Sequence, residues 1–297
     1  MTTIMKKTII IIAIACASLF AACNKNENPT PSVKAHEVTL TVSTEELTKT
    51  VLSLDGSTYK RAWRSGDKIS VIYWDSSNNP HNEKFTLTDG ANTTTGTFAC
   101  PSSEIPDTQY DIKIVYPYMD ETYSSAWWAY SIDYQAYGRL DLSYIGNYDI
   151  LYGYGNYSSG AFNVDSPLSC LVKYLHFPKG MQIIDGSSGA LTVTLTLSAS
   201  GSTKLYNQLL VAKNLNTVSN NEGDITVHYV DLTDGVLDDD IYLSLISETG
   251  TGASFNITVS DGTNSCTYSL DRGENYFYNG YIYHLKQSNF SPLKALE

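Results

Sequence analysis

Apolar and polar residues alternate along most of this chain with a period of two. Val38, Leu40 and Val42 alternate with threonine and serine, which is typical of a strand with one buried face. We find no convincing amphipathic helix of ten or more residues. Similar strand-like runs recur at Lys68–Trp74, Lys84–Thr88, Tyr110–Tyr116, Asp149–Tyr154, Cys170–Phe177, Ala190–Ser198, Asp224–Asp231, Ile241–Ser247, Ala253–Ser260, Cys266–Leu270 and Tyr276–Leu285.

Short turn sequences separate most of these runs. Gly, Asp, Asn and Ser favour tight turns because they tolerate the backbone conformations that such turns require. Many strands at short, turn-punctuated spacing predict an all-β fold made of β-sandwiches. The turn signals are Asp55-Gly56, Ser65-Gly66-Asp67, Asp89-Gly90, Asp185-Gly186, Asp234-Gly235 and Asp261-Gly262.

The N-terminus has the order of an export signal. Lys6 and Lys7 precede an apolar or small run, Thr8–Ala22, which is too short to span about 30 Å of hydrocarbon. Small residues stand directly before Cys23, and the chain turns polar after it. This pattern resembles a bacterial lipobox, with Phe20 where Leu is usual. We therefore predict a lipoprotein signal peptide at 1–22 and acylation of Cys23; an ordinary secretory peptide is the alternative.

The segment after the predicted lipid anchor is polar and contains proline, so residues 23–36 are predicted to be a flexible tether. A second cluster of turn-forming residues lies in Tyr157–Pro167, before a fresh strand pattern at Cys170. We place a domain boundary there, which gives one β-sandwich at 37–162 and another at 163–297. Both lengths lie within the usual range for a domain.

Charge and cysteine content exclude several classes of protein. Removing residues 1–22 leaves 17 of the 19 basic residues against 31 acidic ones, so the formal net charge becomes −14 instead of −12. Nucleic acid is then not an expected partner, because its binding depends on cationic groups that neutralise phosphates. Cys100, Cys170 and Cys266 have no paired spacing. They form either one disulfide and one free thiol or three buried free thiols.

Sequence motifs for catalysis, metals and cofactors are incomplete. His36-Glu37 begins like a zinc helix, but Leu40 stands where the second histidine is needed. Gly153-Tyr154-Gly155 lacks the third glycine of a dinucleotide loop. Asp238-Asp239-Asp240 lacks the alternating spacing of a calcium loop. We therefore expect no catalytic residues, no metal site, no cofactor and no enzymatic activity, although sandwich enzymes can assemble carboxylates from distant strands.

Aromatic residues are concentrated in one segment. Between Tyr116 and Tyr157 there are eleven tyrosines, together with the pair Trp127-Trp128. Exposed rings of this kind stack on sugars or pack into protein interfaces. The same rings could instead fill the space between sheets, since tyrosine favours half-buried positions. Trp127, Trp128 and Tyr130 are the candidates for a ligand-binding or adhesive surface.

Several segments together resemble the fimbrillin family, the lipoprotein precursors of type V pilins in Bacteroidales. Each resemblance is weak alone, and jointly they are fairly specific because they cover nearly the whole mature chain in the family's order. The matching elements are Lys49-Thr50, Trp63–Val71 with its Gly66-Asp67 turn, Tyr116-Pro117-Tyr118, Asp149–Gly153, Leu175-His176-Phe177 and Gly273–Tyr276.

The resemblance implies two transthyretin-like β-sandwich domains in tandem and a role as a pilus subunit. In such pilins the precursor reaches the outer membrane as a lipoprotein, and a trypsin-like protease cuts beyond the first strand. Loss of that strand opens a hydrophobic groove, which a donor strand from another subunit fills by β-augmentation. The partners implied are other pilin subunits, the outer membrane through the lipid, and a host or bacterial surface glycan or protein.

Mapped onto this chain, the removable strand is Glu37–Thr44. The basic residues between it and Lys68 are Lys49, Lys60, Arg61 and Arg64. Arg61 is the first candidate for the cut and Arg64 the second, because both are arginines just before the Gly66-Asp67 turn. Ser288–Glu297 lacks the Val-rich alternation of a long donor segment, so stalk, tip and anchor positions all stay open.

The sequence thus favours a surface-exposed outer-membrane lipoprotein that becomes part of a fimbria after processing and supports adhesion. The alternative is a monomeric carbohydrate-binding surface lipoprotein that uses the Tyr/Trp-rich segment 116–157. A β-sandwich glycan hydrolase is a third and weaker hypothesis.

Overall fold

The computed structural model describes residues 35–44, 53–55, 58–120, 122–124, 127–131, 134–136, 149–212, 219–247, 254–271, 278–287 and 293–294. Within these ranges the chain is made of strands and contains no α-helix, which confirms the all-β prediction. The signal peptide, Cys23, most of the tether and Lys49 lie outside the described residues. Residues 1–35 and 36–297 form separate units, and everything below concerns the second.

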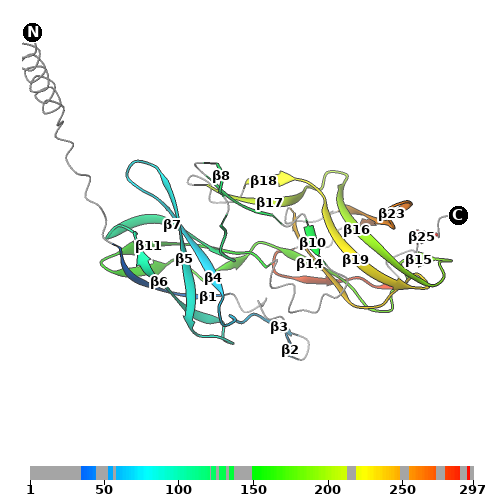
Figure 1. Ribbon diagram of the computed structural model, residues 1–297, viewed down its shortest axis with the longest axis horizontal. Coiled ribbons are helices and arrows are strands. Elements are labelled where there is room, and N and C mark those ends of the chain that lie inside the picture. Colours follow the sequence, from blue (N-terminus) through cyan, green and yellow to red (C-terminus); the bar gives the residue numbers. More distant parts are fainter. Residues whose placement is uncertain are drawn as a thin grey trace, which may run out of the picture. The chain divides into compact units, whose positions relative to one another are not determined.

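The first sheet has eight strands, in the order β1-β6-β5-β4-β7-β11-β12, with β13 paired to β11 (Figure 1). All the pairs for which the structure gives a register are antiparallel. The strands are β1 (His36–Ser43), β4 (Lys68–Trp74), β5 (Pro80–Asp89), β6 (Thr95–Ser103), β7 (Thr108–Tyr116), β11 (Leu151–Ser158), β12 (Ala161–Val164) and β13 (Ser169–Cys170).

Two further sheets come mainly from the second half of the chain. The six-stranded sheet has the order β10-β19-β16-β22-β23, with β20 on β19, and the seven-stranded sheet has the order β24-β14-β21-β17-β9-β8, with β18 on β17. Their strands are β8 (Thr122–Ser124), β9 (Trp127–Ser131), β10 (Tyr134–Ala136), β14 (Lys173–Phe177), β16 (Ala190–Ser200), β17 (Leu205–Ala212), β18 (Ser219–Glu222), β19 (Ile225–Thr233), β20 (Val236–Leu237), β21 (Ile241–Ser247), β22 (Ser254–Ser260), β23 (Ser265–Asp271) and β24 (Ile282–His284).

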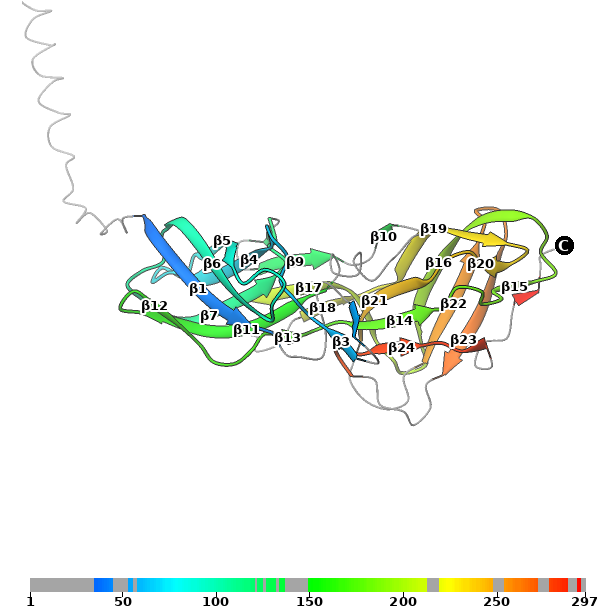
Figure 2. The ribbon, with the colours of Figure 1, turned by 90° about the horizontal axis from the view of Figure 1, so that it is seen from below.

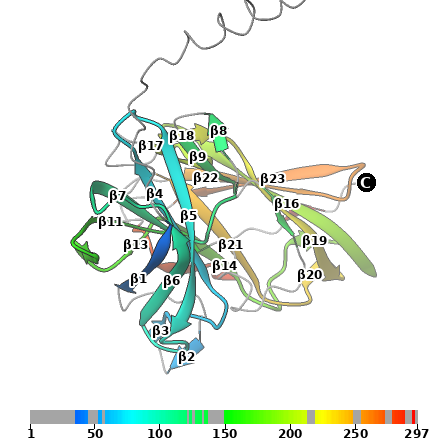
Figure 3. The same ribbon diagram turned by 60° about the vertical axis from the view of Figure 1, so that its left-hand side comes forward.

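Two small sheets complete the set. β15 (Ile184–Asp185) pairs with β25 (Leu293–Lys294), and β2 (Ser53–Asp55) pairs with β3 (Thr58–Lys60) in a hairpin of its own (Figure 3). Buried apolar side chains from all three large sheets belong to one continuous core. No helix among the described residues is long and apolar enough to cross a membrane.

The segment with the predicted domain boundary, Tyr157–Pro167, begins with a hairpin. Ser159 and Gly160 both have positive φ (53° and 81°), as a two-residue hairpin turn requires, and Ser158 pairs with Ala161 across it. The predicted division at 162/163 therefore falls inside β12. Strands on opposite sides of this division also pair with each other, since β9 pairs with β17 and β10 pairs with β19. The division into two domains stays a prediction.

Two histidines meet where β24 pairs with β14 in the seven-stranded sheet. His176 and His284 face each other, with their Nδ1 atoms 2.6 Å apart, so one ring must donate a hydrogen bond and the other must accept it. His176 Nε2 lies 3.0 Å from Asp240 Oδ1, and its ring stacks on Tyr242. Lys179 completes the surroundings through its backbone N–H to Asp240 and its ammonium group 3.8 Å from Asp239.

This histidine pair should make stability depend on pH. Burial and the neighbouring His176 lower the pKa of His284 below its ordinary 6.5. As the pH falls, this histidine therefore takes up a proton at a higher pH in the unfolded chain than in the folded chain. Its contribution to stability is fully present above about pH 6.5 and is lost as the pH falls through and below that value. We expect His284→Gln to flatten the decrease of the melting temperature between neutral and mildly acidic pH. His228→Gln is the control, and an unchanged pH profile for His284→Gln would contradict the assignment.

Candidate functional site

β1 covers the hydrophobic core along one edge of the first sheet. Its burial alternates strictly: Val38, Leu40 and Val42 are 1–3% exposed, whereas Glu37, Thr39 and Thr41 face solvent. This confirms the strand predicted from the sequence. Burying a side chain of this size stabilises a fold by about 1.5–3 kcal/mol. The three side chains together therefore contribute an amount comparable with the total stability of many proteins, about 5–15 kcal/mol.

Among the described residues, β1 has a hydrogen-bonded ladder along one side, with a register shift between His36 and Val38. Its antiparallel partner is β6, with Leu40 opposite Phe98 and Val42 opposite Gly96 (Figure 2). The register is tight at Gly96, because a Cβ there would lie 2.7–2.9 Å from the side chains of Leu87, Trp63 and Phe98. The apolar face of β1 thus packs over a closely filled part of the core.

The other side of β1 is held mainly near its two ends. Leu168 N–H donates to the Ser43 carbonyl oxygen at 2.8 Å, and Thr44 forms an isolated bridge with Leu168. At the opposite end His36 Nε2 lies 3.2 Å from the Tyr157 hydroxyl. A strand that is paired along one edge and buries a full apolar face has the geometry of an insert that another strand of similar pattern could replace.

A buried ion pair anchors the chain just after the segment that follows β1. Arg61 Nη2 donates to Asp149 Oδ1 at 2.7 Å, and neither side chain has any exposed surface. The same oxygen accepts a hydrogen bond from the Tyr174 hydroxyl at 2.6 Å and lies 3.3 Å from Cys170 Sγ. This Arg61 anchor therefore joins residue 61 to Asp149 just before β11, to β13 and to β14.

The surroundings of the Arg61 anchor shift the pKa values of several of its groups. Burial alone would lower the pKa of Arg61, but the Asp149 carboxylate together with Cys170 and Tyr174 outweighs burial, so that this pKa is raised. Burial, with the same carboxylate, raises the pKa of Cys170 to about 11, so the thiol stays protonated. Burial also raises the pKa of Tyr174 well above its usual value, so the phenol remains a hydrogen-bond donor.

Residues from two of the segments named in the sequence comparison with fimbrillins, Trp63–Val71 and Tyr116-Pro117-Tyr118, contact each other beside the Arg61 anchor. Asp67 of the Gly66-Asp67 turn accepts the Arg64 backbone N–H at 2.6 Å and the Tyr116 hydroxyl at 3.2 Å. Gly66 has φ of +86°, which a side chain would strain. The rings of Trp63 and Tyr116 pack edge to face at 5.4 Å. The elements at Trp63–Val71 and at Tyr116 thus form one folded unit in space.

Accessibility is described for two of the four candidate cleavage residues. Arg61 is fully buried and Arg64 is half-buried, and Trp63 between them bonds through its backbone to Asn92 and Thr93. A trypsin-like protease needs the arginine side chain in its pocket and an extended backbone around it. Arg61 does not meet these conditions in the folded chain, and the position of the cut stays a prediction. Lys60 ends the separate β2–β3 hairpin, and Lys49 lies outside the described residues.

The Tyr/Trp-rich segment divides between the core and the surface. Tyr116, Tyr152 and Tyr157 are at most 7% exposed, so these rings are part of the core. Tyr154 is half-buried. Trp127, Trp128 and Tyr130 lie in β9, whose backbone pairs with β17, and their side chains lie outside what the structure describes. Their predicted role as an adhesive surface stays a prediction.

The described residues contain free thiols but no group of side chains that could hold a metal ion. Cys100, Cys170 and Cys266 are all free thiols, but of the predicted three buried thiols only Cys170 is buried, and Cys100 and Cys266 are half-buried. Within the described ranges, no group of three or more His, Cys, Asp or Glu side chains could hold a metal ion.

No family model matches this chain, and no curated protein matches it. Some solved structures align with most of it at low identity. A candidate cell adhesion protein from Bacteroides fragilis gives a TM-score of 0.41 at 10% identity, over 82% of this chain and 89% of that chain. A fimbrial assembly protein from Parabacteroides distasonis gives a TM-score of 0.36 at 11% identity, over 84% and 88%. Such values do not place the chain in a family.

Proposed function

We propose that this chain is a structural subunit of a cell-surface fimbria that supports adhesion and assembles by donor-strand exchange. It would be exported as a lipoprotein, with Cys23 carrying the lipid. The observation that carries the proposal is β1 itself, a single edge strand whose Val38, Leu40 and Val42 fill the core. The sequence resemblance to fimbrillins supports the same function independently.

The proposal includes a cut before the Arg61 anchor rather than within it. A cut after Lys49 or Lys60 would release β1 and leave Arg61 paired with Asp149. A cut after Arg61 would instead carry the guanidinium away and leave a buried carboxylate without its partner. Breaking a buried pair in this way costs about 3–5 kcal/mol. The mature subunit would therefore begin at residue 50 or 61, and its new groove would accept the donor strand of another subunit.

Limited digestion tests the proposal directly. With a trypsin-like protease we expect cleavage after Lys49 or Lys60, followed by a ladder of oligomers on a denaturing gel. We expect the monomer band to disappear almost completely while β1 is being released. Mass spectrometry of the new N-terminus identifies the position of the cut.

The double variant Lys49→Gln/Lys60→Gln should stay uncut and monomeric under the same conditions. Lys179→Gln, at a lysine whose side chain is 67% exposed, is the matched control and should polymerise normally. A protein that is trimmed after Lys49 or Lys60 but stays monomeric would contradict the assembly role. A new N-terminus at residue 62 would contradict the argument from the Arg61 anchor.

A further inference from the structure

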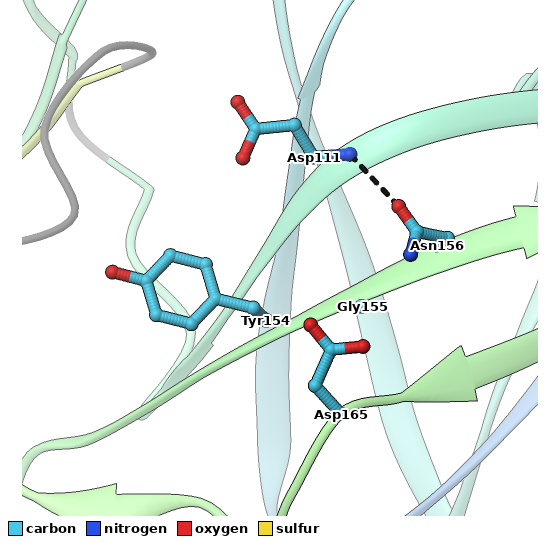
Figure 4. A pocket seen from close by; sticks show the side chains of 5 residues that line it. All are labelled: Asp111, Tyr154, Gly155, Asn156 and Asp165. Carbon is cyan, nitrogen blue, oxygen red and sulfur yellow. Dashed lines mark hydrogen bonds between the residues drawn. The ribbon is translucent and has the colours of Figure 1, made fainter.

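An open pocket of about 500 Å³ lies on the first sheet, apart from β1 and from the Arg61 anchor. It is lined by Asp111 of β7, by Tyr154, Gly155 and Asn156 of β11, and by Asp165 just after β12. Figure 4 shows the ring of Tyr154 on one side, the amide of Asn156 on the other, and the two carboxylates above and below. Two strands and the segment after a third thus bring one ring and three polar groups to one opening.

A β-bulge creates the pocket. The register between β7 and β11 shifts between Gly155 and Tyr157, so that Tyr110 and Asp111 together face Asn156. Asp111 has a left-handed backbone (φ 58°), and its N–H donates to Asn156 Oδ1 at 3.1 Å. Bulges redirect side chains out of the regular alternation of a strand. Here the bulge turns the Asp111 carboxylate toward the pocket instead of along the sheet.

The neighbouring strand and a buried lysine hold the pocket in shape. Gly155 lets β12 approach closely, because a Cβ there would lie 2.8 Å from the Asn163 carbonyl oxygen. Lys113 has no exposed side-chain surface; its ammonium group bonds to Asp111 Oδ1 and lies 4.5 Å from the centre of the Tyr154 ring. Asp165 N–H donates to the Tyr154 carbonyl oxygen at 3.1 Å. The Asp111 carboxylate, the Tyr154 ring and the backbone of Asp165 are therefore fixed before any ligand arrives, whereas the Asp165 side chain is exposed.

The chemistry of the lining selects one class of ligand. Ionised carboxylates only accept hydrogen bonds, so the ligand must be rich in donors. Lys113 already balances Asp111, which leaves the excess negative charge of Asp165 to repel anionic ligands. A tyrosine ring offers a flat apolar face to a flat apolar partner. A pyranose sugar meets these requirements, because it carries no negative charge, has hydroxyl groups around its ring and presents one apolar face.

We propose that this pocket binds an uncharged pyranose, as a single sugar or as the terminal unit of a surface glycan. The proposal rests on the pocket alone and goes beyond assembly of the fimbria, because neither β1 nor the cleavage segment takes part. It also gives Tyr154, in the Tyr/Trp-rich segment, a role distinct from that of the buried tyrosines around it.

Titration of the purified chain with methyl glycosides, followed by ligand-observed NMR, tests the proposal. We expect binding of neutral hexosides or N-acetylhexosaminides with a dissociation constant of about 1 mM, and at least about tenfold weaker binding of uronic acids. Tyr154→Ala should weaken binding about tenfold, whereas Tyr154→Phe, which keeps the ring, should stay within about twofold. Asp165→Ala should also weaken binding about tenfold.

Asp107→Ala, at another exposed carboxylate directly before β7, is the matched control and should bind as the unaltered protein does. Asp165 is exposed, so its replacement should leave the melting temperature unchanged and separate loss of binding from loss of folding. The proposal is overturned if the unaltered chain binds no neutral glycoside. It is equally overturned if Tyr154→Ala and Asp165→Ala bind as well as the control. Either result leaves the digestion and ladder experiment unaffected.

Discussion

Replacing Asp149 by Asn should lower the free energy of unfolding by about 3–5 kcal/mol, because the substitution leaves the Arg61 guanidinium buried without a counter-charge. Asn keeps the shape of the side chain, so the loss reports the charge and not a cavity. The Tyr174 hydroxyl would still meet an oxygen at the position of Asp149 Oδ1. Urea denaturation monitored by tryptophan fluorescence measures the effect.

A second variant distinguishes the ion pair from general damage to the core. In Arg61→Met/Asp149→Leu both charges are removed together, and we expect most of the lost stability to return. Buried ion pairs can often be replaced by apolar residues of similar volume at little net cost. The exposed pair of Lys179 and Asp239, at 3.8 Å, provides the control. Asp239→Asn should change stability by less than about 1 kcal/mol. An equally small effect of Asp149→Asn would show that the buried pair contributes little.

The Arg61 anchor also explains why part of the site could not be predicted from the sequence. A basic residue just before a Gly-Asp turn has the local appearance of an accessible cleavage point. The partner that buries Arg61 is Asp149, which lies 88 residues further along the chain. Ion pairs over such separations leave no local pattern. The segment containing Asp149 was singled out by the family resemblance, but that resemblance carried no information about its partner.

Strand β1, in contrast, could be predicted residue by residue. Alternation of Val38, Leu40 and Val42 with polar residues follows directly from the two-residue period of a strand with one buried face. The turn at Ser159-Gly160 was less clear, because the same small and polar residues serve hairpins and linkers alike. Only the pairing of Ser158 with Ala161 identifies it as a hairpin.

The sugar pocket shows a further limit of the sequence. Asp111, Asn156 and Asp165 come from two strands and the segment after a third, and a left-handed aspartate inside a strand has no sequence signature. The concentration of tyrosines in 116–157 did point to this part of the chain. The pattern could not separate Tyr154, which lines the pocket, from Tyr152, which lies two positions away on the same face of β11 and is buried, or from the buried Tyr157. A bulge moves neighbouring residues out of register, so alternation fails where the pocket forms.

The second large effect is expected within β1. Replacing Leu40, which is 1% exposed, by Asp should remove the strand from its place, because the core would otherwise have to hold an unpaired carboxylate. We expect a loss of more than about 4 kcal/mol, at the upper end of what single substitutions cause. Thr39→Asp is the matched control: it introduces the same charge one position away, on the solvent-facing side of the strand. It should change stability by less than about 0.5 kcal/mol.

The same substitutions decide whether β1 acts as an exchangeable insert. After proteolytic removal of β1, a peptide with the sequence of residues 36–44 should restore the melting temperature, and the Thr39→Asp peptide should do so equally well. The Leu40→Asp peptide should not, because the groove opposite Phe98 requires an apolar side chain. If the unaltered, Thr39→Asp and Leu40→Asp peptides restore stability alike, the groove does not distinguish strands with an apolar face from strands without one. If none does, the trimmed protein has rearranged, and donor-strand assembly through this groove is excluded.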